Sequence, residues 1–317
     1  MLLMLLLATL RLDAGAFPDD ELFFVTGVSS NHFEESLALL YSIKKYHPCG
    51  VLLLYDLGLT IPQVTLLQSG RLMRNIEVID LPDSAHTWHR EFYHGEKAVK
   101  PLFVEDALRR MGNSRGGAGR AGSRRYMFYV DASIRLTKAL DALALQTLHS
   151  RGILVSPKFV GHLQHQYTHP DMFVWFGFEF NKEKALCEGV TDQTMSTSKC
   201  MPQTHSGVFL VDTRNATIVE GVLQPWARCA KFKACIVPDG AYSFVTPKMR
   251  AKMPGRKLYT HRADQGSYSF LLDRIVGRGQ QYRDFSLPVS VITYVQINRN
   301  GKEISAADLY KLPAEIC

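Results

Sequence analysis

The sequence YMFYVDAS, residues 126–133, places five apolar or aromatic side chains directly before Asp131 and Ser133. An apolar run rich in aromatic and β-branched residues predicts a buried strand. Such a strand delivers Asp131 to its carboxyl end, with Ser133 on the same side of the extended backbone. Carboxylate and hydroxyl oxygens suit the hard divalent cations Mg²⁺ and Mn²⁺. The stretch therefore predicts a core strand that ends at a metal site, with a turn or capping role for Asp131 as the alternative.

Upstream of this strand, apolar runs alternate with helical patterns. The runs are ELFFVT at residues 21–26, VLLLYDLG at 51–58 and IEVIDLP at 76–82. This alternation predicts an α/β fold with a mostly parallel central sheet and helices on both faces. Ligands on such sheets lie at the carboxyl ends of strands, so we expect ligand contact from Thr26, Gly27 and Asp56.

The segment that leads into the 126–130 strand predicts a helix and a loop. Apolar residues at helical spacing predict a helix that begins near Pro101 and ends at Gly112. The preceding GEKAVKP brings Lys97 and Lys100 to its start, either as ligands of an anion or as solvated surface residues. Residues 113–125, NSRGGAGRAGSRR, predict a flexible basic insertion. They do not form a dinucleotide-binding loop, because the helix precedes the glycines instead of following them.

Two motifs downstream add candidate site residues. In HSGVFLVD, Ser206 and Gly207 come just before a predicted strand, where glycine lets the backbone approach a ligand closely. In HRADQGSYSFLL, Asp264 and Gln265 open a predicted helix, so they either cap that helix or bind a sugar hydroxyl. His261 is a candidate metal ligand, with a satisfied or surface histidine as the alternative.

Length and composition are those of an ordinary globular protein. The chain has 317 residues, of which 46% are hydrophobic and 21% charged, and we expect residues 20–317 to form one domain. The net charge of +7 suits an anionic ligand. The basic residues are scattered and no nucleic-acid-binding motif is present, so no nucleic-acid partner is expected. The GxSxG elbow of serine hydrolases and the ordered motifs of kinases are also absent.

The first residues indicate entry into the secretory pathway. The apolar stretch MLLMLLLATL is followed by the small-residue triplet AGA at residues 14–16. This pattern predicts a signal peptide over residues 1–16, with a truncated membrane anchor as the alternative. Because the stretch is shorter than the roughly 20 apolar residues of a membrane-spanning helix, an anchor here is the only membrane contact we expect.

The cysteines agree with an oxidising compartment. Six cysteines form no CxxC pair, which argues against zinc. Disulfides are expected, with the pairing left open, among Cys187, Cys200, Cys229 and Cys235. The sequon NAT at residue 215 also agrees with a glycoprotein of this compartment. The expected location is therefore the Golgi lumen or the cell exterior.

In their order and surroundings, these motifs resemble the GT-A fold glycosyltransferases, above all glycosyltransferase family 8 and related animal proteins with an uncharacterised nucleotide-sugar transferase-like domain. FFVTGVSSNHFEESLALLYSIKKYHP looks like the family's first strand and helix, and YMFYVDASIRL is similar to the segment that ends in the metal-binding DxD. HSGVFLVD looks like its NSGV strand, and HRADQGSYSFLL resembles its DQ-containing helix start. The similarity spans residues 20–275.

The resemblance implies a metal-assisted transfer of a sugar from a nucleoside diphosphate sugar, UDP-linked, to a glycan, protein or lipid acceptor. It implies that Asp131 binds the Mn²⁺ or Mg²⁺ ion and the diphosphate, and that Thr26 and Gly27 approach the nucleotide. The residues that it places at the donor sugar or the acceptor are Ser206, Gly207, Asp264 and Gln265, the last two as the catalytic pair.

The sequence departs from the family pattern at two points. Ser133 stands where the second carboxylate of DxD is expected, and no HxxGxxKPW-like segment follows the DQ helix to supply a late histidine ligand. His261 precedes the DQ pair, so it does not simply inherit that role. A catalytically inactive GT-A-like binding or scaffold protein is therefore the alternative to an enzyme.

Overall fold

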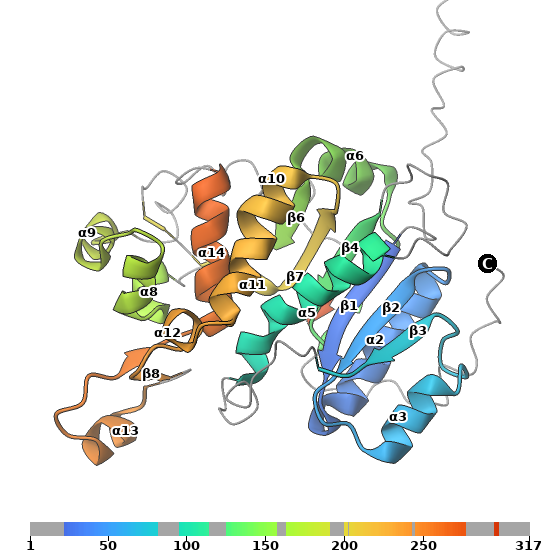
Figure 1. Cartoon of the computed structure of the whole chain (residues 1–317), viewed down its shortest axis with the longest axis horizontal. Helices are drawn as coiled ribbons and strands as arrows, with labels where there is room; N and C mark the ends of the chain where they lie inside the picture. The colour runs from blue at the N-terminus through green and yellow to red at the C-terminus, as the bar shows by residue number, and fades with distance from the viewer. Residues whose placement is uncertain are drawn as a thin grey trace, which may run out of the picture.

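The computed structural model describes residues 22–81, 95–113, 125–156, 163–190, 200–201, 203–242, 245–276 and 295–297. Its centre is a six-stranded sheet in the order β3-β2-β1-β4-β7-β6 (Figure 1). The strands are β1 (Leu22–Val28), β2 (Val51–Asp56), β3 (Ile76–Ile79), β4 (Tyr126–Val130), β6 (Ile153–Ser156) and β7 (His205–Asp212). The first four are parallel, and β7 runs antiparallel to both β4 and β6. The expected α/β class with a mostly parallel sheet is confirmed.

Helices cover both faces of this sheet because its strands are apolar on both sides. In β4, Met127 and Tyr129 join one core cluster, and Phe128 and Val130 join the other. The first cluster is closed by α5 (Gly95–Asn113), α11 (Gln224–Ala230) and α14 (Ala263–Val276), which lie together in Figure 1. The second is closed by α2 (Phe33–Tyr46), α3 (Ile61–Gln68) and α6 (Ala142–Arg151).

The remaining elements are short. They are the 3₁₀ turn Ser30–His32, β5 (Ile134–Leu136), α7 (Gln164–Tyr167), α8 (Pro170–Trp175), α9 (Phe180–Leu186), α10 (Ala216–Ile218), the π-helical turn Val219–Leu223, α12 (Lys233–Ile236), β8 (Ala241–Tyr242), α13 (Pro247–Lys252), β9 (Tyr259–Thr260) and β10 (Val295–Ile297). The predicted leader at residues 1–16 and residues 114–124 of the predicted insertion lie outside the described residues.

Helix α5 starts earlier than its proline suggests. It begins at Gly95 and continues to Asn113, so Pro101 lies inside the helix and not in its first turn. Proline has no N–H, and the carbonyl of residue 97 therefore lacks its usual helical partner. This irregular turn of α5 carries Lys100.

Two disulfides pair the four cysteines that the sequence singled out. Cys187 bonds Cys200, and Cys229 bonds Cys235 to join α11 to α12. Among the described residues no cysteine is free. In the same part of the chain, no helix has both the length and the apolar character needed to cross a membrane.

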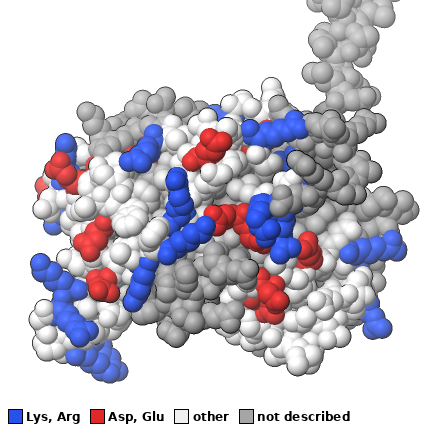
Figure 2. Space-filling model, in the orientation of Figure 1, with Lys and Arg blue, Asp and Glu red and all other residues white. Residues whose placement is uncertain are grey.

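Basic side chains are spread over the face shown in Figure 2 and gather at the end of the molecule where α13 lies. The exposed basic residues of this region are Lys248, Arg250, Lys252, Arg256 and Lys257. The basic residues, which the sequence shows as scattered, are therefore concentrated locally around α13. None of these five residues lines the pocket described below.

Candidate functional site

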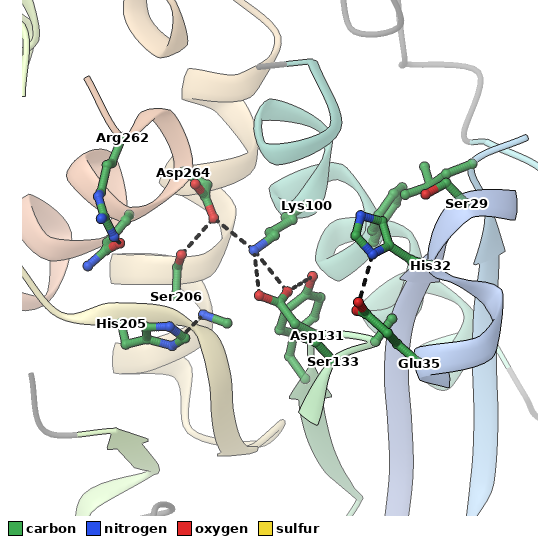
Figure 3. Close-up of a pocket in the computed structure, with 17 residues that line it drawn as sticks. Ser29, His32, Glu35, Lys100, Asp131, Ser133, His205, Ser206, Arg262 and Asp264 are labelled. Atoms are coloured by element: carbon green, nitrogen blue, oxygen red, sulfur yellow. Dashed lines mark hydrogen bonds and ion pairs between the residues drawn. The ribbon is translucent and has the colours of Figure 1, made fainter. Parts of the chain in front are cut away.

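A cavity of about 290 Å³ opens where the carboxyl ends of β1 and β4 meet the start of β7 and of α14 (Figure 3). Parallel strands of an α/β sheet present their carboxyl ends, and the loops that follow, at one edge, which is where such folds bind ligands. The predicted residues that line the cavity are Gly27, Lys100, Asp131, Ser133, Ser206, Gly207, Asp264 and Gln265.

Lys100 is the central charge of this pocket. Its Nζ lies 2.8 Å from Oδ1 and 3.0 Å from Oδ2 of Asp131, and 3.2 Å from Oδ2 of Asp264. The side chain is 14% exposed. Burial lowers the pKa of Lys100, but the carboxylates of Asp131 and Asp264 outweigh it and hold the pKa well above its usual range. The ammonium group therefore keeps its charge.

Asp131 is held by the backbone of two strands. Its N–H donates to the carbonyl of Gly207 at 2.8 Å, which continues the β4–β7 ladder beyond the end of β4. The hydroxyl of Tyr129 donates to Oδ1 at 3.1 Å. With 29% of its side chain exposed, Asp131 faces both the ammonium of Lys100 and the open pocket.

The start of α14 supplies the second carboxylate. Asp264 is 4% exposed, and its Oδ2 accepts the hydroxyl of Ser206 at 2.6 Å. The indole N–H of Trp226 donates to the backbone carbonyl of Asp264 at 3.0 Å and fixes this turn of the helix. Gln265, next along the helix, accepts from Arg262 at 3.2 Å. The two carboxylates therefore reach Lys100 from separate elements.

Glycine is required at two points of the pocket wall. A Cβ on Gly207 would overlap the carboxylate of Asp131 and lie 2.5 Å from the ring of His205. A Cβ on Gly27 would lie 2.5 Å from the ring of Phe103. Both distances are far inside van der Waals contact, so the backbone approaches the site only because these residues have no side chain.

Three predicted residues are not brought into the pocket. The side chain of Asp56 bonds the backbone that follows it: its Oδ1 accepts hydrogen bonds from the N–H groups of Gly58 and Leu59. Thr26 is fully buried within β1 and does not line the cavity. Both residues lie at or near the end of a strand as predicted, but the carboxylate of Asp56 bonds the backbone that follows it, and Thr26 is buried inside the sheet.

His261 is the third, and it does not fit the metal role. Its Nδ1 accepts the N–H of His169 at 3.1 Å, and its Nε2 bonds the carbonyl of Ile236 at 2.9 Å. Both ring nitrogens are thus engaged at a residue that is 2% exposed and outside the pocket. The alternative, a satisfied histidine, is the arrangement found.

Sequence reasoning missed several lining residues. His205 and Arg262 stand inside the quoted motifs HSGV and HRADQ but were not singled out, although both line the pocket. Burial lowers the pKa of His205, and its Nδ1 accepts the N–H of Gly207 at 3.2 Å, so the ring is neutral with its proton on Nε2. His32 and Glu35, joined by a hydrogen bond of 3.1 Å between Nδ1 and Oε2 at the start of α2, also line the pocket.

The described residues do not fit the divalent ion that the resemblance implies. Of its three expected ligands, His261 lies elsewhere, and both oxygens of Asp131 already face Lys100. No group of three His, Cys, Asp or Glu side chains within the described ranges is arranged to hold a metal ion. A metal ion at Asp131 would have to displace the ammonium group of Lys100, which now contacts both carboxylate oxygens. Only Ser133 remains as an uncommitted oxygen ligand of the original set.

Comparison with known proteins finds similarity in part of the chain and in overall shape. A model of the family described as "Protein of unknown function (DUF1647)" matches residues 9–95. No curated protein sequence matches the chain.

Solved structures with a similar shape include three glycosyltransferases. The bifunctional glycosyltransferase WbbM is 11% identical at a TM-score of 0.41, and the alignment covers 83% of this chain but only 39% of WbbM. The galactosyltransferase LgtC, in complex with donor and acceptor sugar analogues, is 13% identical at a TM-score of 0.41, with 90% of this chain and 93% of LgtC covered. Core-mannan synthase A from Aspergillus fumigatus, in a Mn/GDP form, is 8% identical at a TM-score of 0.38, with 83% and 71% covered. At these values the function of the chain has to be argued from its own site.

Proposed function

We propose that this protein is a glycosyltransferase that moves a sugar from a nucleoside diphosphate sugar to an acceptor hydroxyl. The observation that carries the proposal is the cluster of Lys100, Asp131 and Asp264 in a pocket at the carboxyl ends of parallel strands. Asp131 and Asp264 belong to motifs that resemble glycosyltransferase family 8, and Lys100 contacts both of their carboxylates. This grouping supports a donor site at the pocket.

The roles follow from the position of each residue. The backbone at Gly27 borders the nucleotide, and Asp131 with Lys100 faces the diphosphate. Ser206 and Asp264, joined by their 2.6 Å hydrogen bond, present polar groups to the sugar hydroxyls, and Gln265 stands beside them. Uridine is the base we propose, on the resemblance of the first strand and helix alone. A glycan, protein or lipid remains the proposed acceptor.

The reaction exchanges one bond at the anomeric carbon. The bond from this carbon to the β-phosphate oxygen breaks and leaves its electron pair on that oxygen. The acceptor hydroxyl oxygen forms the new bond to the same carbon, and its proton passes to water or to the released nucleoside diphosphate. Negative charge grows on the leaving diphosphate, so a positive charge held in place beside it lowers the barrier. We assign no step to Mn²⁺ or Mg²⁺, because the described residues do not fit such an ion.

We also propose that the protein works in the lumen of the secretory pathway or outside the cell. The support is the pairing of Cys187 with Cys200 and of Cys229 with Cys235, because disulfides persist in oxidising compartments.

The test is release of nucleoside diphosphate from a panel of UDP-sugars and GDP-sugars, with wild-type protein and two matched variants. Asp131→Asn keeps the shape but removes the charge that holds the ammonium group of Lys100 in position, and we expect turnover to fall about 10²-fold, the loss that a displacement of a catalytic group by about 1 Å produces. Asp56→Asn changes the equivalent residue at the end of β2, outside the pocket, and should leave turnover unchanged.

Equal turnover by wild-type and Asp131→Asn protein, with both folded by circular dichroism, would exclude the proposed role of Asp131. An inactive GT-A-like binding protein is the second candidate, and the serine at position 133 favours it. Nucleotide binding without turnover of any donor would establish that candidate instead.

A further inference from the structure

We propose that this transferase works without a divalent ion and that the buried ammonium group of Lys100 supplies the positive charge that the ion would otherwise bring to the diphosphate. The inference rests on the proposed function and concerns the chemistry of the same pocket. It separates this chain from enzymes in which two carboxylates and a histidine hold a metal ion.

The first support is the position of the ammonium group. Lys100 Nζ faces both oxygens of Asp131, at 2.8 and 3.0 Å, and reaches Asp264 at 3.2 Å (Figure 3). A cation bound by Asp131 from the pocket side would lie within a few ångströms of this charge, in surroundings where like charges repel strongly. Lysine therefore occupies the place of the cation at the end of β4.

The second support is what stands where the metal ligands are expected. Ser133 has replaced a carboxylate, and His261 uses both ring nitrogens in the scaffold. The neutral hydroxyl of Ser133 adds no negative charge to the pocket. Among the described residues, Asp131 and Asp264 are then the only carboxylates that contact Lys100, and its ammonium group supplies the positive charge beside them.

The balance of charge in the pocket decides whether a metal ion is still drawn to it. The lining carboxylates are Glu35, Asp131 and Asp264, and the lining cations are Lys100 and Arg262. Glu35 is bonded to His32 at the start of α2 and does not contact Lys100. The other four charged lining residues carry equal numbers of negative and positive charges, and the one excess negative charge belongs to Glu35. The two carboxylates that contact Lys100, those of Asp131 and Asp264, are therefore already paired with a cation.

Asp264 allows the ammonium group to turn to a phosphate oxygen. When the 3.2 Å ion pair between Asp264 and Lys100 breaks, Asp264 still accepts the 2.6 Å hydrogen bond from the hydroxyl of Ser206. A phosphate oxygen can then accept a hydrogen bond from one of the three N–H groups of the ammonium, and the carboxylate of Asp131 accepts from the other two. The developing charge on the leaving diphosphate is then met by an ammonium group that Asp131 holds in position, so the reorganisation is limited to the loss of one contact.

The first experiment is titration calorimetry of UDP into the wild-type chain, once with EDTA and once with Mn²⁺. We expect the same affinity in both buffers, and equal donor turnover in both. The electron paramagnetic resonance signal of Mn²⁺ provides a second readout: because UDP itself binds Mn²⁺ through its phosphates, the signal of Mn²⁺ with UDP should be the same with and without the protein. Binding or turnover that requires Mn²⁺ would overturn the inference and leave the proposed function standing.

The second experiment uses Lys100→Met, which keeps length without charge. We expect UDP affinity in EDTA to fall about 10- to 100-fold, the loss expected when one charged hydrogen bond is removed. Lys231→Met is the matched control. Lys231 follows α11, pairs at 2.7 Å with Glu105 of α5, the helix that carries Lys100, and lies outside the pocket. Lys100→Arg restores the charge and should recover part of the affinity, provided that both variants melt cooperatively.

The outcomes distinguish the two proposals. Unchanged UDP affinity in a folded Lys100→Met protein would overturn the role of Lys100. If wild-type protein binds neither UDP nor GDP in either buffer and turns over no donor, the proposed function itself fails. Loss of folding in Lys100→Met would leave the comparison of EDTA with Mn²⁺ on wild-type protein as the deciding measurement.

Discussion

At Gly207 the chain has room for a hydrogen atom and for nothing larger. The carboxylate of Asp131 and the ring of His205 lie where a methyl group would project. The strand β7 passes this close because the carbonyl of Gly207 accepts the N–H of Asp131. One residue without a side chain thus sets the position of the pocket's main carboxylate.

Gly207→Ala should therefore damage the site more than the fold. The methyl group pushes Asp131 or His205 aside, and a displacement of about 1 Å costs about 10²-fold in turnover. Stability should fall by about 1–3 kcal/mol, as in other overpacked positions. Turnover and urea unfolding of Gly207→Ala check this, with Gly112→Ala as the control because nothing lies near its Cβ position. Full turnover by Gly207→Ala would contradict the geometry.

Single residues show how far the sequence alone leads. The strand-end rule and the motif order lead to Asp131, Ser206, Gly207 and Asp264, all of which line one pocket. The same rule selects Asp56, whose side chain instead bonds the backbone that follows it. Periodicity places a residue at the end of a strand but does not tell which hydrogen bonds its side chain will form.

At the scale of elements, α5 is held to the sheet by one buried carboxylate. Asp106 accepts the hydroxyl of Tyr55 in β2 at 2.9 Å and Nε of Arg110 at 2.6 Å, and it also pairs with Arg109. Arg110 in turn pairs with Glu77 in β3. Because α5 also carries Lys100, this network helps to fix the pocket's cation.

The pKa of Asp106 gives this network a pH dependence. Burial by itself raises the pKa, but the hydrogen bonds from Arg110, Arg109 and Tyr55 outweigh it and hold the pKa below its usual range. A carboxyl whose pKa is lower in the folded state than its unfolded value of about 3.9 stabilises the fold above that pH. The contribution is lost as the pH falls through the folded pKa.

Asp106→Asn should consequently be less stable than wild type at neutral pH by about 1–3 kcal/mol, with part of the interaction screened through the exposed arginines. The difference should shrink as the pH falls from about 4 through the folded pKa, because the wild-type carboxyl loses its charge there. Urea unfolding at several pH values measures it. Asp171→Asn, at a carboxylate that is 70% exposed, serves as the control. A difference that stays constant down to pH 2 would rule out this account.

Helix boundaries were less predictable than helix existence. The apolar spacing predicted α5 correctly as a helix, but Pro101 suggested a start that lies too late, since the helix begins at Gly95. Proline is tolerated inside the helix here because other contacts, including the Asp106 network, hold the segment in place. Tertiary contacts of this kind cannot be read from local spacing.

At the scale of the whole molecule, the pocket is assembled from segments that lie far apart in the sequence. Gly27 comes from β1, Lys100 from α5, Asp131 from the end of β4, Ser206 from β7 and Asp264 from α14. Core clusters on both faces of the sheet hold these elements. A ligand in the pocket therefore contacts residues from all five of these elements. Its effect on unfolding can test whether residues 20–317 form the single domain that the sequence predicts.

UDP should raise the melting temperature of the full chain in one calorimetric transition. Binding only to the folded state stabilises it by about 2.7 kcal/mol when UDP is present at 100 times its Kd. Uridine, which lacks the phosphates that Lys100 would contact, should give a much smaller shift at the same concentration. Two separate transitions, only one of them moved by UDP, would show that the chain contains two independent domains.

Because the pocket residues are spread across the sequence, a match to a family model over part of the chain describes only part of the pocket. The family model covers residues 9–95, a stretch that carries Gly27, His32 and Glu35 and ends before Lys100 and Asp131. Two chains can therefore match that model equally well and still differ at the position of Lys100, whose ammonium group is the central charge of the pocket. Comparing relatives at the positions of Lys100 and Ser133 would divide them into a lysine-bearing lineage and a metal-binding one, a division that the shared stretch conceals.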